Sequence, residues 1–202
     1  MKSLQELEKS VSCETIKKLK LYEQLLKKWQ KAINLVGKNT VEDAWNRHIL
    51  DSLQVIKYLP KNENLSIVDL GSGAGFPPLV ISMSGYNNVS AIESDERKCF
   101  FMQEVAKQTN TKINIINERI EKVEKMQADV ITSRALAKID ELLIFSKDLS
   151  NEDTIYLFLK GKTAQKEVEK ARESFDFEAE TFKSLTSSEA NIIKITNLKE
   201  KK

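Results

Sequence analysis

The fold of this chain is decided by one stretch, Ile67-Val68-Asp69-Leu70-Gly71-Ser72-Gly73-Ala74-Gly75-Phe76. Residues typical of a buried strand run directly into glycines at alternate positions. Glycine lets the backbone turn tightly and lets a ligand approach it without a Cβ in the way. In an open α/β sheet, ligands bind outside the carboxyl ends of the strands. The stretch therefore predicts a ligand-binding turn between a strand and a helix.

Beyond this turn, short apolar runs alternate with helical stretches. The runs that predict strands are Leu65–Leu70, Val89–Glu93, Lys112–Asn117, Asp129–Ser133 and Thr154–Lys160. The stretches that predict helices are Phe76–Gly85, Glu96–Thr109, Ile139–Leu149 and Ala164–Glu173. Such alternation is typical of an α/β fold, in which helices cover both faces of a parallel sheet. Two further β-like runs, Ala179–Leu185 and Ala190–Thr196, predict an antiparallel hairpin at one sheet edge.

The segment before the sheet has a different, helical pattern. Apolar residues at spacings of three and four predict an amphipathic helix over Ile16–Val36 that Gly37 ends, and a second helix over Val41–Tyr58. Pro60 and the polar residues after it place a boundary between a helical extension, 1–61, and a ligand-binding domain, 62–202.

The N-terminal segment is also the basic part of the chain. Residues 1–60 hold eleven Lys or Arg against seven Asp or Glu, a net charge of +4, although the whole chain carries only +2. A basic segment beside a near-neutral body suits a protein that meets a phosphate backbone. An ordinary helix with a solvated lysine face would have the same charge.

Composition excludes several classes of protein. With 41% hydrophobic and 31% charged residues, the chain is neither disordered nor fibrous. It contains no apolar run of membrane-spanning length and no secretory signal, so we expect a cytoplasmic protein with no membrane partner. Cys13 and Cys99 are far apart and accompany one histidine, which argues against a disulfide framework and against a metal site.

The glycine loop also indicates which ligand it binds. A dinucleotide-binding loop would have a third glycine where this chain has Phe76, which disfavours an NAD-dependent oxidoreductase. Pro77 and Pro78 follow, and proline supplies no N–H group to a phosphate. The loop therefore suits a nucleoside ligand without a pyrophosphate, and S-adenosylmethionine fits this description.

Two carboxylates flank the loop. Glu93 ends the second predicted strand, where it can accept hydrogen bonds from both hydroxyls of a ribose. Asp69 precedes the first glycine and is a second candidate for cofactor binding. Alternatively, either residue could cap the helix that follows it.

Three cations follow the predicted strands at the edge that faces the ligand. Arg119 follows the third strand, Arg134 the fourth and Lys160 the fifth. We expect them to converge on one pocket, which would suit an anionic substrate such as RNA.

Five segments resemble the bacterial glucose-inhibited division protein B family, the small-subunit rRNA methyltransferase G proteins. They are Trp29-Gln30-Lys31-Ala32-Ile33-Asn34-Leu35, Arg47-His48-Ile49-Leu50-Asp51-Ser52-Leu53, the Val68–Pro77 loop, Ser133-Arg134-Ala135 and Leu159-Lys160-Gly161. Five matches in the right order, covering nearly all of the chain, make the resemblance specific. Pro78 departs from the family, which often has glycine there.

This resemblance implies a class I S-adenosylmethionine-dependent methyltransferase fold with an N-terminal helical extension. It implies methyl transfer to N7 of a guanine in 16S rRNA of the small ribosomal subunit, by a protein that we expect to be a monomer. The cofactor would contact Gly71, Gly73, Phe76, Glu93, Ile120, Glu121 and Arg134, and Arg119, Arg134 and Lys160 would face the RNA.

The chemistry of N7 agrees with what the sequence lacks. Guanine N7 carries a free lone pair, so no base has to remove a proton, and catalysis would come from alignment of the reacting groups. We interpret Arg134 as the residue that positions cofactor and target, and His48 as structural. Two alternatives stay open, a methyltransferase for a small molecule and a non-enzymatic module on the same fold that senses nucleotides or binds RNA.

Overall fold

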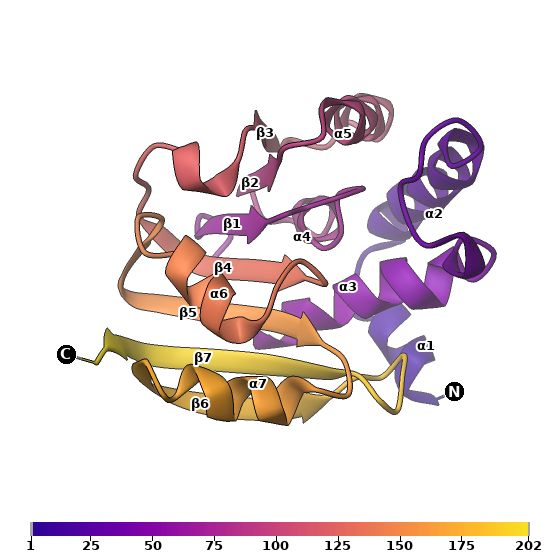
Figure 1. Ribbon diagram of the computed structural model, residues 1–202. Coiled ribbons are helices and arrows are strands. Elements are labelled where there is room, and N and C mark those ends of the chain that lie inside the picture. The colour runs from indigo at the N-terminus through magenta and orange to yellow at the C-terminus, as the bar shows by residue number, and fades with distance from the viewer. Residues whose placement is uncertain (1, 202) are drawn as a thin grey trace.

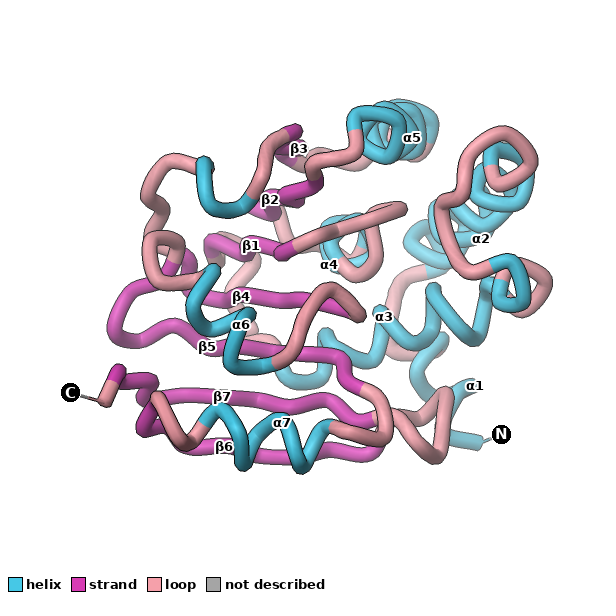
Figure 2. The backbone as a smooth tube through the Cα atoms, in the orientation of Figure 1, coloured by secondary structure: helices cyan, strands magenta, loops and turns pink. Residues whose placement is uncertain are grey.

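The computed structural model describes residues 2–201, which form one sheet with helices on both faces (Figure 1). Seven strands of the described residues follow one another in the order β3-β2-β1-β4-β5-β7-β6. Their bounds are β1 Ser66–Leu70, β2 Asn88–Glu93, β3 Asn114–Asn117, β4 Ala128–Arg134, β5 Ser150–Lys160, β6 Phe175–Lys183 and β7 Asn191–Glu200. Figure 2 shows them as one stack with β3 at one end and β6 at the other. The predicted α/β fold is confirmed.

The strands β1 to β5 pair in parallel, so their carboxyl ends share one edge of the sheet. At that edge Leu70 of β1 pairs with Ile92 of β2 and with Ser133 of β4. The predicted hairpin is also confirmed, because β7 pairs antiparallel with both β5 and β6. Its strands are longer than predicted, since Phe175 and Phe177 bury alternate positions of β6 despite the charged residues between them.

The two faces of the sheet bury separate hydrophobic clusters. Successive strand residues point to opposite faces, so Val68 of β1 packs with the helices α6 Ile139–Phe145 and α7 Ala164–Ala171. Its neighbour Ile67 packs on the other face. That face carries the helices α4 Pro78–Met83 and α5 Glu96–Gln108.

The N-terminal segment begins with α1 Lys2–Glu8 and α2 Cys13–Trp29. The predicted helix end at Gly37 is wrong, because α2 ends at Trp29 and Gly37 has an ordinary φ of −57°. The cause is Gln30, whose side-chain oxygen accepts from the N–H groups of Leu35 and Val36 at 2.9 and 3.0 Å. These hydrogen bonds hold a compact turn in which Leu35 is buried.

The predicted second helix is not one regular helix. A 3-10 turn at Lys38–Thr40 precedes a π-helical turn at Trp45–Leu50, then α3 Asp51–Leu53 and a 3-10 segment at Gln54–Tyr58. Apolar residues three or four positions apart can share a face in any of these short turns, so their spacing does not separate the turn types. The π-helical turn turns His48 inward, where it is 7% exposed.

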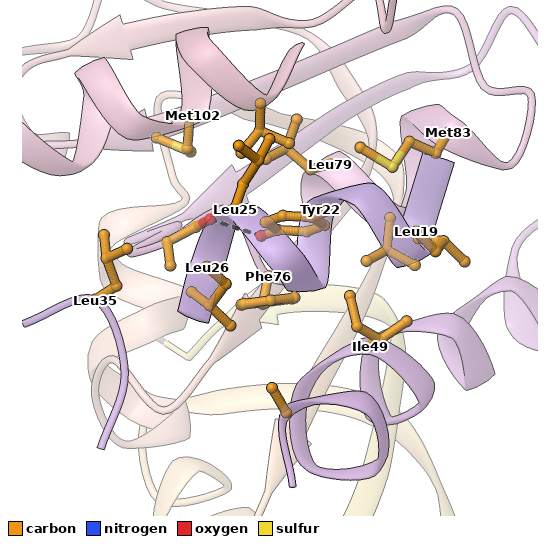
Figure 3. Packing of buried hydrophobic residues seen from close by; sticks show 14 of the residues in the cluster. Leu19, Tyr22, Leu25, Leu26, Leu35, Ile49, Phe76, Leu79, Met83 and Met102 are labelled. Carbon is orange, nitrogen blue, oxygen red and sulfur yellow. Dashed lines mark hydrogen bonds between the residues drawn. The ribbon is translucent and has the colours of Figure 1, made fainter. Parts of the chain in front are cut away.

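Helix α2 packs against α4 and α5, and its residues share one hydrophobic cluster with the sheet domain. Figure 3 shows Tyr22 of α2 lying against Phe76, beside Leu19 and Leu26. The division of the chain into 1–61 and 62–202 stays a prediction. No helix among the described residues is both long and apolar enough to span a membrane.

Candidate functional site

The glycine loop leaves β1 in a conformation that other residues rarely adopt. Gly71 and Gly73 have φ angles of +65° and +57°, in the left-handed region that a Cβ disfavours. A Cβ on Gly71 would also lie 2.6 Å from the Cδ1 atom of Leu136. The sequence therefore needs glycine at Gly71 for two reasons, its backbone conformation and the side chain above it.

Glu93 ties the end of β2 to this loop. Its Oε2 atom accepts a hydrogen bond from the Gly73 N–H and its Oε1 atom from the Asp95 N–H, both at 2.8 Å. The side chain is 8% exposed. The alternative that Glu93 caps α5 is wrong, since Asp95 is the cap and accepts from the Arg97 N–H at 3.0 Å.

A cleft of about 150 Å³ opens beside Glu93, which we call the glycine-loop cleft. Its walls include Gly71, Glu93, Arg119, Ile120, Glu121 and Leu136. The structure thus brings together four of the residues expected to bind the cofactor, Gly71, Glu93, Ile120 and Glu121. A glycine turn, a carboxylate and an apolar wall fit a nucleoside.

Asp69 lies behind the loop and does not reach the cleft. It is fully buried and accepts a 2.6 Å hydrogen bond from the Thr132 hydroxyl, while its Oδ2 atom has no partner among the described residues. Burial raises the pKa of Asp69 to about 7. The alternative that Asp69 caps a helix is wrong, because its hydrogen bond joins β1 to β4.

Phe76 is buried beneath the loop in a stack of planar groups. Its ring centroid lies 4.7 Å from that of Tyr22 and 5.3 Å from that of His48. The Arg134 guanidinium carbon lies 5.1 Å from the same centroid. With 2% exposure, Phe76 supports the loop from behind. Gly73 is partly exposed and donates to Glu93, but neither Gly73 nor Phe76 lines the cleft.

Arg134 ends β4 and is held by residues of the N-terminal segment. Its NH1 group donates to the Arg47 carbonyl oxygen at 3.2 Å and to His48 Nδ1 at 2.9 Å. The same nitrogen lies 3.6 Å from a carboxylate oxygen of Asp51. The side chain keeps 17% exposure, which is the part that faces a pocket.

That pocket has a volume of about 420 Å³ and lies where β4 and β5 end. We call it the basic pocket, defined by Arg47, His48, Asp51, Arg134, Lys160 and Lys162. Ala135 lines the basic pocket and the next residue, Leu136, lines the glycine-loop cleft. Ala135 has a φ of +55°, an uncommon conformation for a residue other than glycine. Ala135 and Leu136 thus form a wall between the two openings.

The cations that follow the strands do not share one pocket. Arg134 and Lys160 line the basic pocket, but Arg119 lines the glycine-loop cleft, so the expectation that all three converge is wrong for Arg119. The strand order explains the difference. Strand β3, which precedes Arg119, lies on one side of β1, whereas β4 and β5 lie on its other side.

The lysine expected to face RNA has a counter-ion within the protein. The Lys160 ammonium lies 2.6 Å from a carboxylate oxygen of Glu167, and its side chain is 7% exposed. Arg47 and Lys162, by contrast, are exposed and form no ion pair with any described residue. Lys162 was not a candidate from the sequence, and only its place on the rim of the pocket identifies it.

The two cysteines are not placed for catalysis. Cys99 is buried, and its thiol lies 3.3 Å from the Glu93 carbonyl oxygen. Burial raises the pKa of Cys99 to about 11, so it is a thiol at neutral pH. Cys13 begins α2 and lines neither opening. Within residues 2–201 there is also no group of three or more metal-ligating side chains.

Known proteins are similar to this chain in sequence and in fold. The family model described as rRNA small subunit methyltransferase G matches residues 15–196. The Ribosomal RNA small subunit methyltransferase G of Rickettsia felis is 43% identical over 185 residues, which cover 92% of this chain and 95% of that protein.

Two solved structures share the fold at low sequence identity. A ribosomal protein L11 methylase from Lactobacillus delbrueckii subsp. bulgaricus is 18% identical with a TM-score of 0.62, covering 75% of this chain and 79% of its own. A SAM dependent methyltransferase from Aquifex aeolicus is 14% identical with a TM-score of 0.60, and the match covers 76% of this chain and 92% of that protein. The fold is that of S-adenosylmethionine-dependent methyltransferases, and by its sequence the chain belongs to the rRNA small subunit methyltransferase G family.

Proposed function

We propose that this protein transfers a methyl group from S-adenosylmethionine to N7 of a guanine in 16S rRNA of the small ribosomal subunit. The observation that carries this proposal is the pair of adjoining openings. One is lined by the glycine loop and Glu93, the other by cations, and the wall of Ala135 and Leu136 lies between them. Membership of the family supports the reaction and the class of substrate.

The glycine-loop cleft is the proposed cofactor site. Glu93 would bind the ribose hydroxyls, Ile120 and Glu121 the adenine end, and Gly71 and Gly73 would let the ligand lie on the backbone. Asp69 and Phe76 would act from behind, by holding the loop in place. Arg134 would lie where the cofactor and the target nucleotide meet.

The basic pocket is the proposed RNA side. Arg134 and Lys160 line its inner part, whereas Arg47 and Lys162 are exposed on its rim and have no counter-ion among residues 2–201. Free cations at a rim suit phosphate groups, because they need not give up an existing ion pair. Arg119, at the cleft, would contact RNA beyond the target nucleotide.

The site needs no general base for this reaction. The methyl donor supplies an electrophilic carbon on a sulfonium, and the N7–carbon bond forms as the sulfur–carbon bond breaks, with no proton to remove. The residues Ser133-Arg134-Ala135 at the end of β4 contain no acid or base suited to deprotonating an exocyclic amine. The chain's own contribution is to hold the reacting groups in line. We propose that it does so as a monomer in the cytoplasm, where ribosomal RNA is found.

The experiment is a transfer assay with three kinds of acceptor. Purified protein and S-adenosylmethionine labelled at the methyl group are incubated with small ribosomal subunits, with free 16S rRNA, or with a metabolite extract. We expect label in the rRNA, released as 7-methylguanine. A Glu93→Ala variant is the matched control and should lose cofactor affinity. Label in the metabolites alone would indicate a small-molecule methyltransferase, and cofactor binding without transfer would indicate a sensor.

A further inference from the structure

His48 and Arg134 form a hydrogen bond whose direction is fixed by chemistry. A guanidinium group has only donors, so the 2.9 Å contact between Arg134 NH1 and His48 Nδ1 requires an unprotonated Nδ1. The hydrogen of a neutral imidazole then lies on Nε2, which is 2.8 Å from the Thr40 hydroxyl oxygen. That hydroxyl donates onward to the Gly37 carbonyl oxygen at 2.7 Å. Each donor in this series of hydrogen bonds therefore has an acceptor.

The surroundings of His48 hold it in the neutral form. The ring is 7% exposed and stacks on Phe76. Arg134 and Arg47 are the cations that act on it, and a carboxylate oxygen of Asp51 lies 3.6 Å from Arg134 NH1. Burial, followed by the charges of Arg134 and Arg47, lowers the pKa of His48 to about 3. A doubly protonated ring would present a donor to Arg134 and break the contact.

The consequence lies on the other edge of the guanidinium. NH1 is occupied by the Arg47 carbonyl, His48 and Asp51. Nε and NH2 have no hydrogen-bond partner among the described residues, and Arg134 lines the basic pocket. A guanidinium binds a pair of oxygen acceptors through two parallel N–H groups. With NH1 held, the Nε and NH2 edge is the one left for a ligand.

We propose that His48 is a positioning residue, which accepts from NH1 of Arg134 through Nδ1 and thereby aims the Nε and NH2 edge at a substrate oxygen pair in the basic pocket. This inference rests on the proposed function, since it assigns a role within the same site. It replaces the sequence-based interpretation of His48 as structural only.

Two substitutions separate the two ring nitrogens. In His48→Asn the side-chain oxygen takes the place of Nδ1 and can still accept from Arg134. In His48→Gln the amide group takes the place of Nε2, which keeps the link to Thr40 and leaves Arg134 without its acceptor. If His48 were merely structural, the rates of methyl transfer of the two variants would not follow this order.

We expect His48→Asn to lower the rate of methyl transfer by about fivefold, the scale of one neutral hydrogen bond. We expect His48→Gln to lower it by about 100-fold, because misplacement of a positioning group costs that much. Binding of S-adenosylhomocysteine shows that each variant is folded. Equal rates for the two variants, or a faster His48→Gln, would overturn the proposal.

A spectroscopic measurement tests the same proposal without activity. In 15N NMR spectra of the wild-type protein, we expect the His48 Nδ1 signal in the unprotonated range and the Nε2 signal in the protonated range at neutral pH. A protonated Nδ1 would overturn the inference even if the enzyme is active. An inactive wild-type protein with the expected signals would instead refute the proposed function and leave the tautomer established.

Discussion

The hydroxyl of Tyr22 donates a 2.6 Å hydrogen bond to the carbonyl oxygen of Ala74, so helix α2 holds the glycine loop from behind. The Tyr22 ring stacks on Phe76, the residue that ends the loop. The N-terminal segment is therefore part of the support of the cofactor site, in addition to any contact with RNA. No pattern in the sequence marks Tyr22 for this role, because its spacing is that of an ordinary core residue.

Tyr22→Phe keeps the ring and removes this hydrogen bond. We expect a loss of about 1–3 kcal/mol in the free energy of unfolding, because the buried Ala74 carbonyl loses its partner. We also expect several-fold weaker binding of S-adenosylhomocysteine, measured by calorimetry. Tyr156→Phe is the matched control, since Tyr156 is 1% exposed on the opposite face of the sheet. If the control weakens binding equally, the support ascribed to α2 is refuted.

Gly71→Ala should damage the cofactor site directly. The left-handed conformation costs a residue with a Cβ about 1–2 kcal/mol, and the new atom would collide with Leu136. We expect lower stability and weaker S-adenosylhomocysteine binding. Removing the Leu136 side chain in a double variant should recover part of the loss, since it relieves the collision but leaves the backbone strain. Gly161→Ala, where a Cβ meets no atom within 4 Å, is the control, and binding as tight in Gly71→Ala as in this control would contradict the prediction.

The strand-to-loop junction and Glu93 were predictable because each depends on local sequence. Glycines at alternate positions after an apolar run allow few other structures, and an acid at the end of the next strand follows from parallel pairing. The pocket of Arg119 was not predictable in this way, since it depends on the order of strands in the sheet. The pairing of Lys160 with Glu167 depends on how α7 packs.

The N-terminal segment illustrates a different limit. Apolar spacing continues past Trp29, yet the Gln30 side chain satisfies backbone groups of Leu35 and Val36 and ends the helix early. Such competition between a side chain and the helix leaves no trace in hydrophobic periodicity. The hydrogen bond between His48 and Arg134 likewise joins residues that only the fold brings together.

The ion pair of Lys160 predicts a split between stability and RNA binding. Lys160→Met would leave the largely buried Glu167 carboxylate without its counter-ion, with the Thr163 hydroxyl still donating to it at 2.7 Å. We therefore expect a loss of about 3 kcal/mol in the free energy of unfolding. Lys162→Met should leave stability unchanged, weaken RNA binding, and reduce the salt dependence of binding by about one unit of slope. Chemical denaturation and RNA binding at several salt concentrations measure both. A Lys162→Met protein with wild-type affinity and slope would refute its contact with phosphate.

Stability should depend on pH through His48. The pKa of His48 is about 3 in the folded protein and about 6.5 in an unfolded chain. Between these values the unfolded state binds the extra proton, so the protein should lose stability as the pH falls below about 6.5. The loss from this residue is up to about 1.4 kcal/mol per pH unit. In His48→Asn this component should vanish from unfolding curves recorded between pH 4 and pH 7.

The pH dependence of stability that comes from Asp69 should have the opposite sign to that from His48. Its pKa is raised to about 7 in the folded protein, so the folded state holds the extra proton and stability should fall as the pH rises from about 4 to 7. Asp69→Asn should remove that fall and leave the His48 component in place. If both variants change the pH profile in the same direction, the assignment of these two groups is wrong.

The central claim is that this chain methylates N7 of a guanine in the small-subunit rRNA. The most direct measurement maps 7-methylguanosine in rRNA from cells with and without the gene, by chemical cleavage at the modified base. We predict one cleavage site in 16S rRNA that disappears when the gene is deleted and returns when the wild-type gene, but not Glu93→Ala, is restored. An identical cleavage pattern with and without the gene would contradict the account.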